Sequence, residues 1–294
     1  MEENRKLGKY RVLGTLGRGG EGCVYLALDE SLSRLAAVKR LWEKEKNGKA
    51  GSGERENGQI RQEAAFLRDL RHPMLPVVYE LLYEEDWYLV MEYIDGISLH
   101  KYMENHGPVG EEQGRLWAAA LLDVLSYLHT REIPVIYKDL KPDNIMVCRD
   151  GSLRLVDFGA AGFHSFGECT DRRMAYTAGF AAPEQRMTDG GRSWADERSD
   201  IYAFGKTFYY MLTGADPGAA PGTTLSLSCY NPLLSAELDR VIRRCMEEEP
   251  GARYQVVSEV MRDLKKRERH RTADRGEFIR RVEKQICLAG SFHI

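Results

Sequence analysis

The first third of the chain alternates short apolar runs with glycines, a pattern that is typical of β-strands. Residues 10–38 follow it, and two more strand-like runs lie at 77–82 and 87–93. Residues 43–58 are polar and glycine-rich without any period, which indicates a flexible loop. Residues 60–70 instead place their apolar side chains at helical spacing, so a helix is expected there.

Beyond residue 96 the pattern becomes mostly helical. Apolar stretches at 116–128 and 201–212, and amphipathic ones at 238–246 and 256–264, predict helices. Strands are therefore gathered in the first third of the chain and helices in the remainder. This segregation predicts an α+β protein with two lobes.

Composition and charge exclude several classes of protein. The net charge of -3 argues against nucleic-acid binding by bulk positive charge. No apolar run approaches the roughly 20 residues that span a bilayer, and the charged N-terminus has no apolar segment typical of a signal peptide. The six cysteines form no CxxC pair, so neither a zinc site nor a disulfide framework is indicated. We expect a cytoplasmic protein without a nucleic-acid partner or a transmembrane segment.

A glycine-rich motif, Gly-Arg-Gly-Gly-Glu-Gly-Cys-Val, occupies residues 17–24. The pattern GxGxxG alone is a weak signal, and a dinucleotide-binding turn requires a helix after it. Here a strand-like run follows at residues 24–28, which disfavours that interpretation. A glycine-rich hairpin can instead lay its backbone N–H groups over phosphates, because no Cβ blocks the approach. An ordinary flexible hairpin is the alternative.

A lysine and a glutamate form a second candidate pair. Lys39 ends an apolar strand-like run, and Glu63 lies on the apolar stripe of the expected helix at 60–70. A carboxylate on a buried face needs a cationic partner, because an unpaired buried charge is costly. We therefore expect Glu63 to pair with Lys39. The alternatives are an exposed Lys39 at a strand edge and a Glu63 that reaches solvent at the edge of its stripe.

Two strand-like runs, at residues 145–148 and 153–156, flank the dipeptide Asp150-Gly151, which is a strong hairpin-turn signal. A two-residue turn at this dipeptide places Asn144 opposite Asp157. An amide oxygen and a carboxylate would then lie side by side at the open end of the hairpin. Hard oxygen ligands of this kind suit Mg²⁺ beside phosphates.

Asp139 stands five residues before Asn144, in a polar segment pinned by Pro142. Its carboxylate could accept a hydroxyl proton, and Lys141 could stabilise a transferring phosphoryl group. The alternative is a hairpin with incidental polar ends, and the number of matching residues in one segment argues against it.

The ordered set of motifs resembles the eukaryotic-like protein kinases of the bacterial Ser/Thr type, over roughly residues 10–264. Each motif is modest, but their order along the chain is specific. The matching positions are residues 17–24 for the glycine-rich loop, Lys39 for the V-A-I-K lysine, Glu63 for its helix partner, residues 137–144 for the catalytic loop, residues 157–159 for D-F-G, residues 182–184 for A-P-E, Asp200 for the buried aspartate, and Arg253 for the arginine that pairs with Glu184.

The resemblance implies a bilobal kinase-like fold within residues 8–268. It comprises a β-rich N-lobe at 8–91 with one main helix, a hinge at 92–95, and a larger, mostly helical C-lobe at 96–268. It also implies ATP and Mg²⁺ as cofactors, and in-line transfer of the γ-phosphoryl group to Ser/Thr hydroxyls of protein substrates. Residues 269–294 are then a basic tail or the start of a truncated further segment.

The resemblance also implies roles for individual residues. Asp139 is the catalytic base, Lys141 favours Ser/Thr substrates, Lys39 holds the α- and β-phosphates beside Glu63, and Asn144 and Asp157 bind Mg²⁺. Thr177 contacts the catalytic loop. The implied nucleotide-binding residues are Gly17, Gly19, Gly22, Val24, Ala37, Lys39, Met91 as gatekeeper, and Glu92, Tyr93 and Ile94, which receive the adenine.

Two positions depart from the family pattern. Tyr137 replaces the H-R-D histidine, and Lys138 replaces the arginine that grips an activation-loop phosphate with a planar fork. Lysine is a point charge and is not equivalent. We therefore expect activity to depend only weakly on phosphorylation of this loop. Thr170 and Ser165 are candidate autophosphorylation sites, or else plain polar loop residues.

Two other functions compete with a protein kinase. A pseudokinase scaffold is expected to lack Lys39, Asp139 or Asp157, and all three are present. A small-molecule kinase of related fold is disfavoured by Lys141, Thr177 and the A-P-E segment. Near the C-terminus, the basic stretch at 262–284 has the composition of a solvated helix face.

Overall fold

The computed structural model describes residues 5–19, 22–41, 67–163, 179–186, 193–217 and 226–265. The chain divides into two compact units, one of Met1–Asn105 with Pro142–Ala161 and one of His106–Lys141 with Gly162–Ile294. The lobe and hinge limits expected from the sequence stay a prediction. Within the described ranges, none of the helices has both the length and the hydropathy needed to cross a bilayer.

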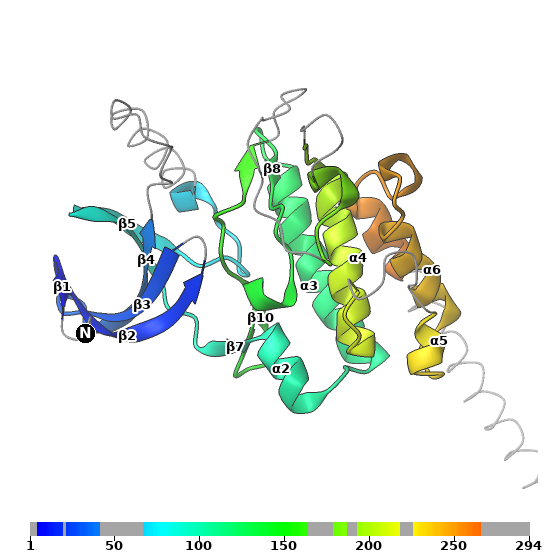
Figure 1. Cartoon of the computed structure of the whole chain (residues 1–294), viewed down its shortest axis with the longest axis horizontal. Helices are drawn as coiled ribbons and strands as arrows, with labels where there is room; N and C mark the ends of the chain where they lie inside the picture. The colour runs from blue at the N-terminus through cyan, green and yellow to red at the C-terminus, as the bar shows by residue number, and fades with distance from the viewer. Residues whose placement is uncertain are drawn as a thin grey trace, which may run out of the picture. The chain divides into compact units, whose positions relative to one another are not determined.

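A six-stranded antiparallel sheet in the order β1-β2-β3-β4-β6-β5 forms the body of the first unit. Figure 1 shows this sheet strongly curled, as expected from the right-handed twist of its strands. The strands confirm the β-rich first third of the chain. Their bounds are β1 (Lys6–Leu7), β2 (Tyr10–Gly19), β3 (Gly22–Asp29), β4 (Arg34–Leu41), β5 (Val78–Glu84) and β6 (Asp86–Glu92).

The two faces of this sheet differ in character. Tyr25, Val38 and Val90 face one another across β3, β4 and β6 and belong to the apolar core of the unit. Successive side chains of a strand point to opposite faces. Val24 and its cross-strand partner Lys39 therefore lie on the other face, which carries the candidate site.

A small second sheet completes the first unit. Its order is β10-β9-β7, and a short helix and a 3-10 turn adjoin it. The bounds are β7 (Gly96–Ser98), α2 (Leu99–His106), η1 (Pro142–Asn144), β9 (Ile145–Cys148) and β10 (Leu153–Leu155).

The loop of the β9–β10 hairpin is one residue longer than the sequence predicted. Cys148 N donates to Ser152 O at 2.9 Å, and Leu153 pairs with Val147. Three residues, 149–151, therefore make the turn, and Gly151 takes a left-handed φ of 80°. A three-residue loop with a left-handed glycine is the next most common hairpin connection after the two-residue turns, and Asp150-Gly151 is compatible with both.

This longer loop shifts the register of the hairpin. Val156 N donates to Asn144 O at 2.8 Å, so Asn144 lies opposite Val156. The prediction that Asn144 lies opposite Asp157 is therefore wrong by one residue. Asp157 follows the paired part of the hairpin instead.

The second unit is mostly helical, as expected for the later part of the chain. In Figure 1, α3 and α4 lie side by side, and α6 packs beside α4. The elements are α3 (Glu111–His129), β8 (Val135–Ile136), β11 (Gly162–Phe163), η2 (Pro183–Gln185), α4 (Glu197–Thr213), α5 (Leu227–Tyr230), α6 (Ala236–Cys245), η3 (Pro250–Ala252) and a helix at residues 257–265.

Helix α4 is the central element of this unit. Asp196 caps its N-terminus by accepting from Arg198 N at 2.8 Å, and Gly214 ends it with a left-handed φ of 70°. Every residue from Ser199 to Thr213 is buried, so the helix is covered on all sides. The expected helix at 60–70 is described only at residues 67–69, which are helical, and the expected loop at 43–58 lies outside the described residues.

A buried ion pair ties the A-P-E segment to the end of the second unit. Arg253 Nη1 and Nη2 donate to the two carboxylate oxygens of Glu184 at 2.7 and 2.9 Å, and both side chains are almost fully buried. Ser199 Oγ also donates to Glu184, at 2.7 Å. This confirms the pairing of Glu184 with Arg253 that the resemblance implied.

Removing one partner of this pair should destabilise the protein strongly. We expect Arg253→Met to lower the free energy of unfolding by about 3–5 kcal/mol, because it leaves the Glu184 carboxylate buried without its counter-charge. Urea denaturation followed by circular dichroism measures the loss. The control is Arg240→Met, since Arg240 forms an exposed pair with Glu237 at 3.6 Å and should cost less than about 1 kcal/mol. Equal losses for the two variants would contradict the prediction.

Candidate active site

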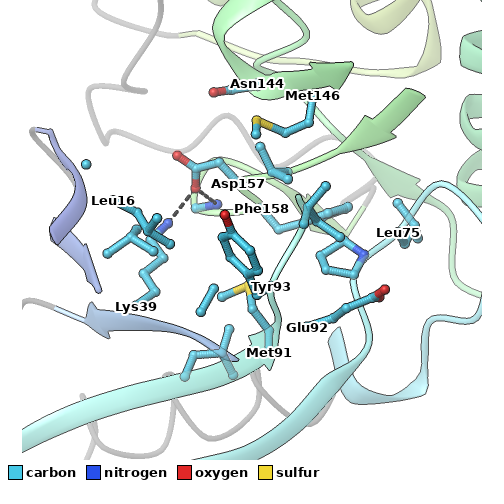
Figure 2. Close-up of a pocket in the computed structure, with 18 of the residues that line it drawn as sticks. Leu16, Lys39, Leu75, Met91, Glu92, Tyr93, Asn144, Met146, Asp157 and Phe158 are labelled. Atoms are coloured by element: carbon cyan, nitrogen blue, oxygen red, sulfur yellow. Dashed lines mark hydrogen bonds and ion pairs between the residues drawn. The ribbon is translucent and has the colours of Figure 1, made fainter. Parts of the chain in front are cut away.

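A cavity of about 580 Å³ opens on the sheet face opposite the core of the first unit. All of its lining residues belong to that unit. Figure 2 shows Lys39, Asp157, Asn144 and Met91 around it. The predicted site residues that line it are Gly17, Val24, Ala37, Lys39, Met91, Glu92, Tyr93, Ile94, Asn144 and Asp157.

The glycine-rich motif forms the hairpin between β2 and β3. Gly17 pairs with Val24, and Gly19 pairs with Gly22 next to the turn. A strand follows the motif rather than a helix, as the sequence predicted, so the turn is not of the dinucleotide-binding type. Gly17 and Val24 line the cavity, whereas Gly19 and Gly22 lie farther along the hairpin.

Lys39 and Asp157 form an ion pair within the cavity, drawn as a dashed line in Figure 2. The side chain of Lys39 is 11% exposed and that of Asp157 is 38% exposed, so solvent reaches the carboxylate more than the ammonium group. The sequence predicted Glu63 as the partner of Lys39, and Glu63 lies outside the described residues. The described partner is therefore the D-F-G aspartate.

The backbone of Asp157 adopts an uncommon conformation. Its φ is 64°, a left-handed value that costs a residue with a Cβ some conformational energy. The carboxylate oxygen Oδ1 also accepts from Gly159 N at 3.2 Å. This geometry turns the Asp157 side chain toward Lys39. If the chain simply continued the β10 strand, this direction of the side chain would not be expected.

The oxygen atoms of the site fit a magnesium ion that is shared with phosphates. Asn144, which carries an amide oxygen, and Asp157, which carries a carboxylate, both line this cavity. Among the described residues, no group of three or more His, Cys, Asp or Glu side chains could hold a metal by itself. Magnesium typically binds one or two carboxylates and completes its shell with water and substrate phosphates.

The segment that follows β6 forms another wall of the cavity. Glu92, Tyr93 and Ile94 line it, and Gly96 begins β7 against β9. A Cβ at Gly96 would lie 2.6 Å from Val147 O, closer than atoms can approach. Glycine is therefore required where this segment meets the hairpin.

Several apolar residues of the cavity were not expected from the sequence. Leu16, Leu75 and Met146 line it but were not predicted. One signal was available for Met146, because it alternates with the buried Ile145 and Val147 and so points to the other face of β9. No local sequence pattern predicts that Leu75 lines the cavity, since its position depends on how the segment after residue 70 folds back.

In the second unit, one buried aspartate organises the predicted catalytic loop. Asp200 accepts from Tyr137 N at 2.8 Å and from Lys138 N at 2.7 Å. His129 Nε2 lies 2.8 Å from Asp200 Oδ2. Charged acceptors make the stronger hydrogen bonds in proteins, so Asp200 holds the backbone at residues 137–138 firmly.

The residues next to this anchor are also constrained. Lys138 has a left-handed φ of 70°, and Gln185 Nε2 donates to its carbonyl oxygen at 2.8 Å. Burial lowers the pKa of Lys138 below its usual range, and the Asp200 charge partly offsets this. Asp139 and Lys141 form an ion pair at 2.7 Å, with side chains that are 18% and 19% exposed.

A family model described as protein kinase domain matches residues 10–266. The chain belongs to the protein kinase family. The remaining site residues predicted from the resemblance, Ser165, Thr170 and Thr177, lie outside the described residues.

Similar proteins support this membership. The chain is 30% identical over 286 residues to a probable serine/threonine-protein kinase, SCO3848, of Streptomyces coelicolor, covering 90% of this chain and 41% of that protein. It is 29% identical over 271 residues to the serine/threonine-protein kinase PrkC of Bacillus subtilis, covering 88% of this chain and 40% of the relative. The chain thus spans about two fifths of the length of these relatives.

A solved structure agrees on the fold. The crystal structure of the Mycobacterium tuberculosis PknI kinase domain matches with a TM-score of 0.68 and 23% sequence identity, over 90% of this chain and 98% of that one. This confirms the predicted α+β protein-kinase fold.

The close approach at Gly96 gives a prediction for the cavity wall. Gly96→Ala should lower the free energy of unfolding by about 2 kcal/mol, because two stretches of backbone must move apart to admit the methyl group. Gly14→Ala is the matched control, since a Cβ there meets nothing within 4 Å, and it should change stability by less than about 0.5 kcal/mol. Chemical denaturation of both variants measures the difference, and a tolerated Gly96→Ala would contradict the close approach.

Proposed function

We propose that this protein is a serine/threonine protein kinase that transfers the γ-phosphoryl group of ATP to protein hydroxyls. The observation that supports this most directly is that Lys39, Asn144 and Asp157 line one cavity. A cation for phosphates and two oxygen ligands for a metal are the groups that phosphoryl transfer needs. The names of the similar proteins, which are serine/threonine-protein kinases, support the same activity.

The cavity suggests how the nucleotide would be held. We assign the adenine to the wall formed by Glu92, Tyr93 and Ile94, with Met91 as gatekeeper. Val24 and Ala37 line the cavity on the sheet face and would supply apolar contacts to the base. The glycine-rich hairpin, with Gly17, Gly19 and Gly22, would lie over the phosphates.

The charged groups would carry the chemistry. Lys39 would exchange its ion pair with Asp157 for the α- and β-phosphates, with Glu63 as its further partner. Asn144 and Asp157 would hold Mg²⁺, which supplies neutralisation of the phosphate charge when bound. Asp139 would accept the proton of the attacking hydroxyl, and Lys141, already paired with Asp139, would stabilise the transferring group. Positioning and charge neutralisation account for catalysis, without a covalent enzyme intermediate.

Protein substrates with Ser/Thr acceptors follow from this proposal, and so does autophosphorylation at Thr170 or Ser165. We also propose a cytoplasmic location, where ATP is available. The four described cysteines, Cys23, Cys148, Cys229 and Cys245, are free thiols, which suits a reducing compartment.

A phosphoryl-transfer assay tests the activity. Purified protein with labelled ATP, Mg²⁺ and a generic Ser/Thr protein substrate should transfer label. Asp157→Ala should lower the rate at least about 100-fold, the scale on which single electrostatic groups act in catalysis. Asp69→Ala is the control, because Asp69 is 64% exposed, forms a surface pair with Arg68 and does not line the cavity, and it should retain activity. Nucleotide binding without transfer by the wild-type protein would favour the pseudokinase scaffold, and transfer only to small molecules would favour a small-molecule kinase.

The lysine at position 138 generates a second prediction. Because a partly buried lysine with a lowered pKa is a poor substitute for a phosphate-binding arginine fork, activity should depend little on loop phosphorylation. Thr170→Ala and Tyr176→Phe should each change the transfer rate by less than about fivefold, the scale of an exposed ion pair. Steady-state kinetics with phosphorylation mapped by mass spectrometry checks this. The idea fails if phosphorylation of either residue proves essential.

A further inference from the structure

Arg154, in the middle of β10, joins three segments of the first unit that are distant in sequence. Its Nη2 atom donates to Glu92 Oε2 at 2.5 Å and to Leu75 O at 3.2 Å. Glu92 is the last residue of β6 and opens the wall that we assign to the adenine. Leu75 belongs to the segment that leads into β5, and it also lines the cavity.

The Glu92 carboxylate makes a further contact through the same oxygen atom. Its Oε2 atom also accepts from Val77 N at 3.1 Å, while the backbone N of Glu92 donates to Val77 O at 2.8 Å. Figure 2 shows the Glu92 side chain directed away from Lys39 and Asp157. The carboxylate therefore acts as a structural acceptor that anchors the backbone of Glu92.

Arg154 donates charge-assisted hydrogen bonds, which are the stronger hydrogen bonds in proteins. The side chains of Arg154 and Glu92 are only 20% and 29% exposed, so water screens the pair weakly. Arg154 Nε is nevertheless buried and has no acceptor among the described residues. A buried N–H without an acceptor costs stability, so an arginine here is not the optimal choice for stability alone. Its two bonded acceptors, Leu75 O and the Glu92 carboxylate, both belong to segments that line the cavity.

The same hairpin carries the metal-binding candidates. Arg154 pairs across the strands with Met146, which lines the cavity, and Asp157 follows three positions later in the chain. A backbone bond from Leu155 N to Met74 O, at 2.7 Å, adds to the link between β10 and the segment at residues 72–77. Fixing Glu92 to β10 therefore sets the distance between the wall at residues 92–94 and the oxygen ligands.

We infer that Arg154 is a positioning residue for the nucleotide, because it holds the backbone of Glu92 to Ile94 at a fixed place relative to Asn144 and Asp157. This inference rests on the proposed function, since it assumes that adenine binds at residues 92–94. Arg154 itself does not line the cavity. It acts through Glu92 and Leu75, so its removal should affect the base end of the site and spare the phosphate end.

Two probes separate the two ends of the site. Adenosine reports on the base end alone, and magnesium tripolyphosphate, as a competitor of ATP, reports on the phosphate end alone. In Arg154→Met the dissociation constant of adenosine should rise about tenfold, the scale of one charge-assisted hydrogen bond. The inhibition constant of magnesium tripolyphosphate should stay within about twofold of the wild-type value, because Lys39, Asn144 and Asp157 keep their places. A general loss of stability would be expected to weaken binding at both ends of the site, and not at one end alone. In the transfer assay KM for ATP should rise while kcat is retained.

Three further variants make the test specific. Arg154→Lys keeps the charge but not the fork, so its adenosine affinity should lie between those of the wild type and Arg154→Met. The double variant Glu92→Gln with Arg154→Met leaves no buried unpaired carboxylate, and it should bind adenosine no more weakly than Arg154→Met alone. Arg149→Met is the matched control, because Arg149 lies on the same hairpin and pairs with Asp95 at 3.0 Å but is 84% exposed, and it should behave as the wild type.

The outcomes distinguish this inference from the proposed function. A wild-type protein that neither binds adenosine nor transfers phosphoryl groups would overturn the proposed function, and the inference with it. An active wild type whose Arg154→Met variant binds adenosine unchanged would overturn the inference alone. The inference would be overturned as well if Arg154→Met weakened adenosine and tripolyphosphate binding equally, or if Arg149→Met weakened adenosine binding as much as Arg154→Met does. If Arg154→Met fails to fold, Arg154→Lys and the double variant take its place in the comparison. Unchanged adenosine binding in these variants, or equal weakening of adenosine and tripolyphosphate binding, would again overturn the inference.

Discussion

The site in the first unit depends on the pairing of β9 with β10. This hairpin presents Asn144 and Asp157 at its open end, and β9 also pairs with β7, which follows the wall at residues 92–94. A slip of one residue in a β pairing turns every side chain of that strand to the opposite face. The three-residue turn that ends in Gly151 therefore determines which side chains reach the cavity, although it lies at the far end of the hairpin.

Alternation along the strands made much of the first unit predictable. The family resemblance implied Val24, Ala37 and Lys39 as nucleotide-binding residues, and all three line the cavity. Ala37 and Lys39 flank the core residue Val38 in β4, so the period of two along a strand turns them to the other face of the sheet. The hairpin register was not predictable, since Asp150-Gly151 suits turns of two and of three residues. The described partner of Lys39, Asp157, lies 118 residues away, and no local pattern indicates such a contact.

The second unit was predicted at the level of helices but not of their polar contacts. The apolar stretches at 116–128 and 201–212 located α3 and α4 well, because apolar runs of this length are too long for a strand and suit a buried helix. Asp200 and Arg253 were identified only through the family resemblance. Their hydrogen bonds to backbone groups of other segments follow from the packing of α4, which neither periodicity nor charge along the chain reveals.

Arg253 uses its whole set of N–H donors. Nε donates to Glu247 O, Nη1 to Glu184 and Arg198 O, and Nη2 to Glu184 and Glu248 O. A lysine offers three donors on one tetrahedral nitrogen and would strand some of these acceptors in the interior. Even lysine, the chemically closest residue, is therefore a poor replacement at this position. Substitution tables, which score Arg to Lys as mild, would misjudge this site.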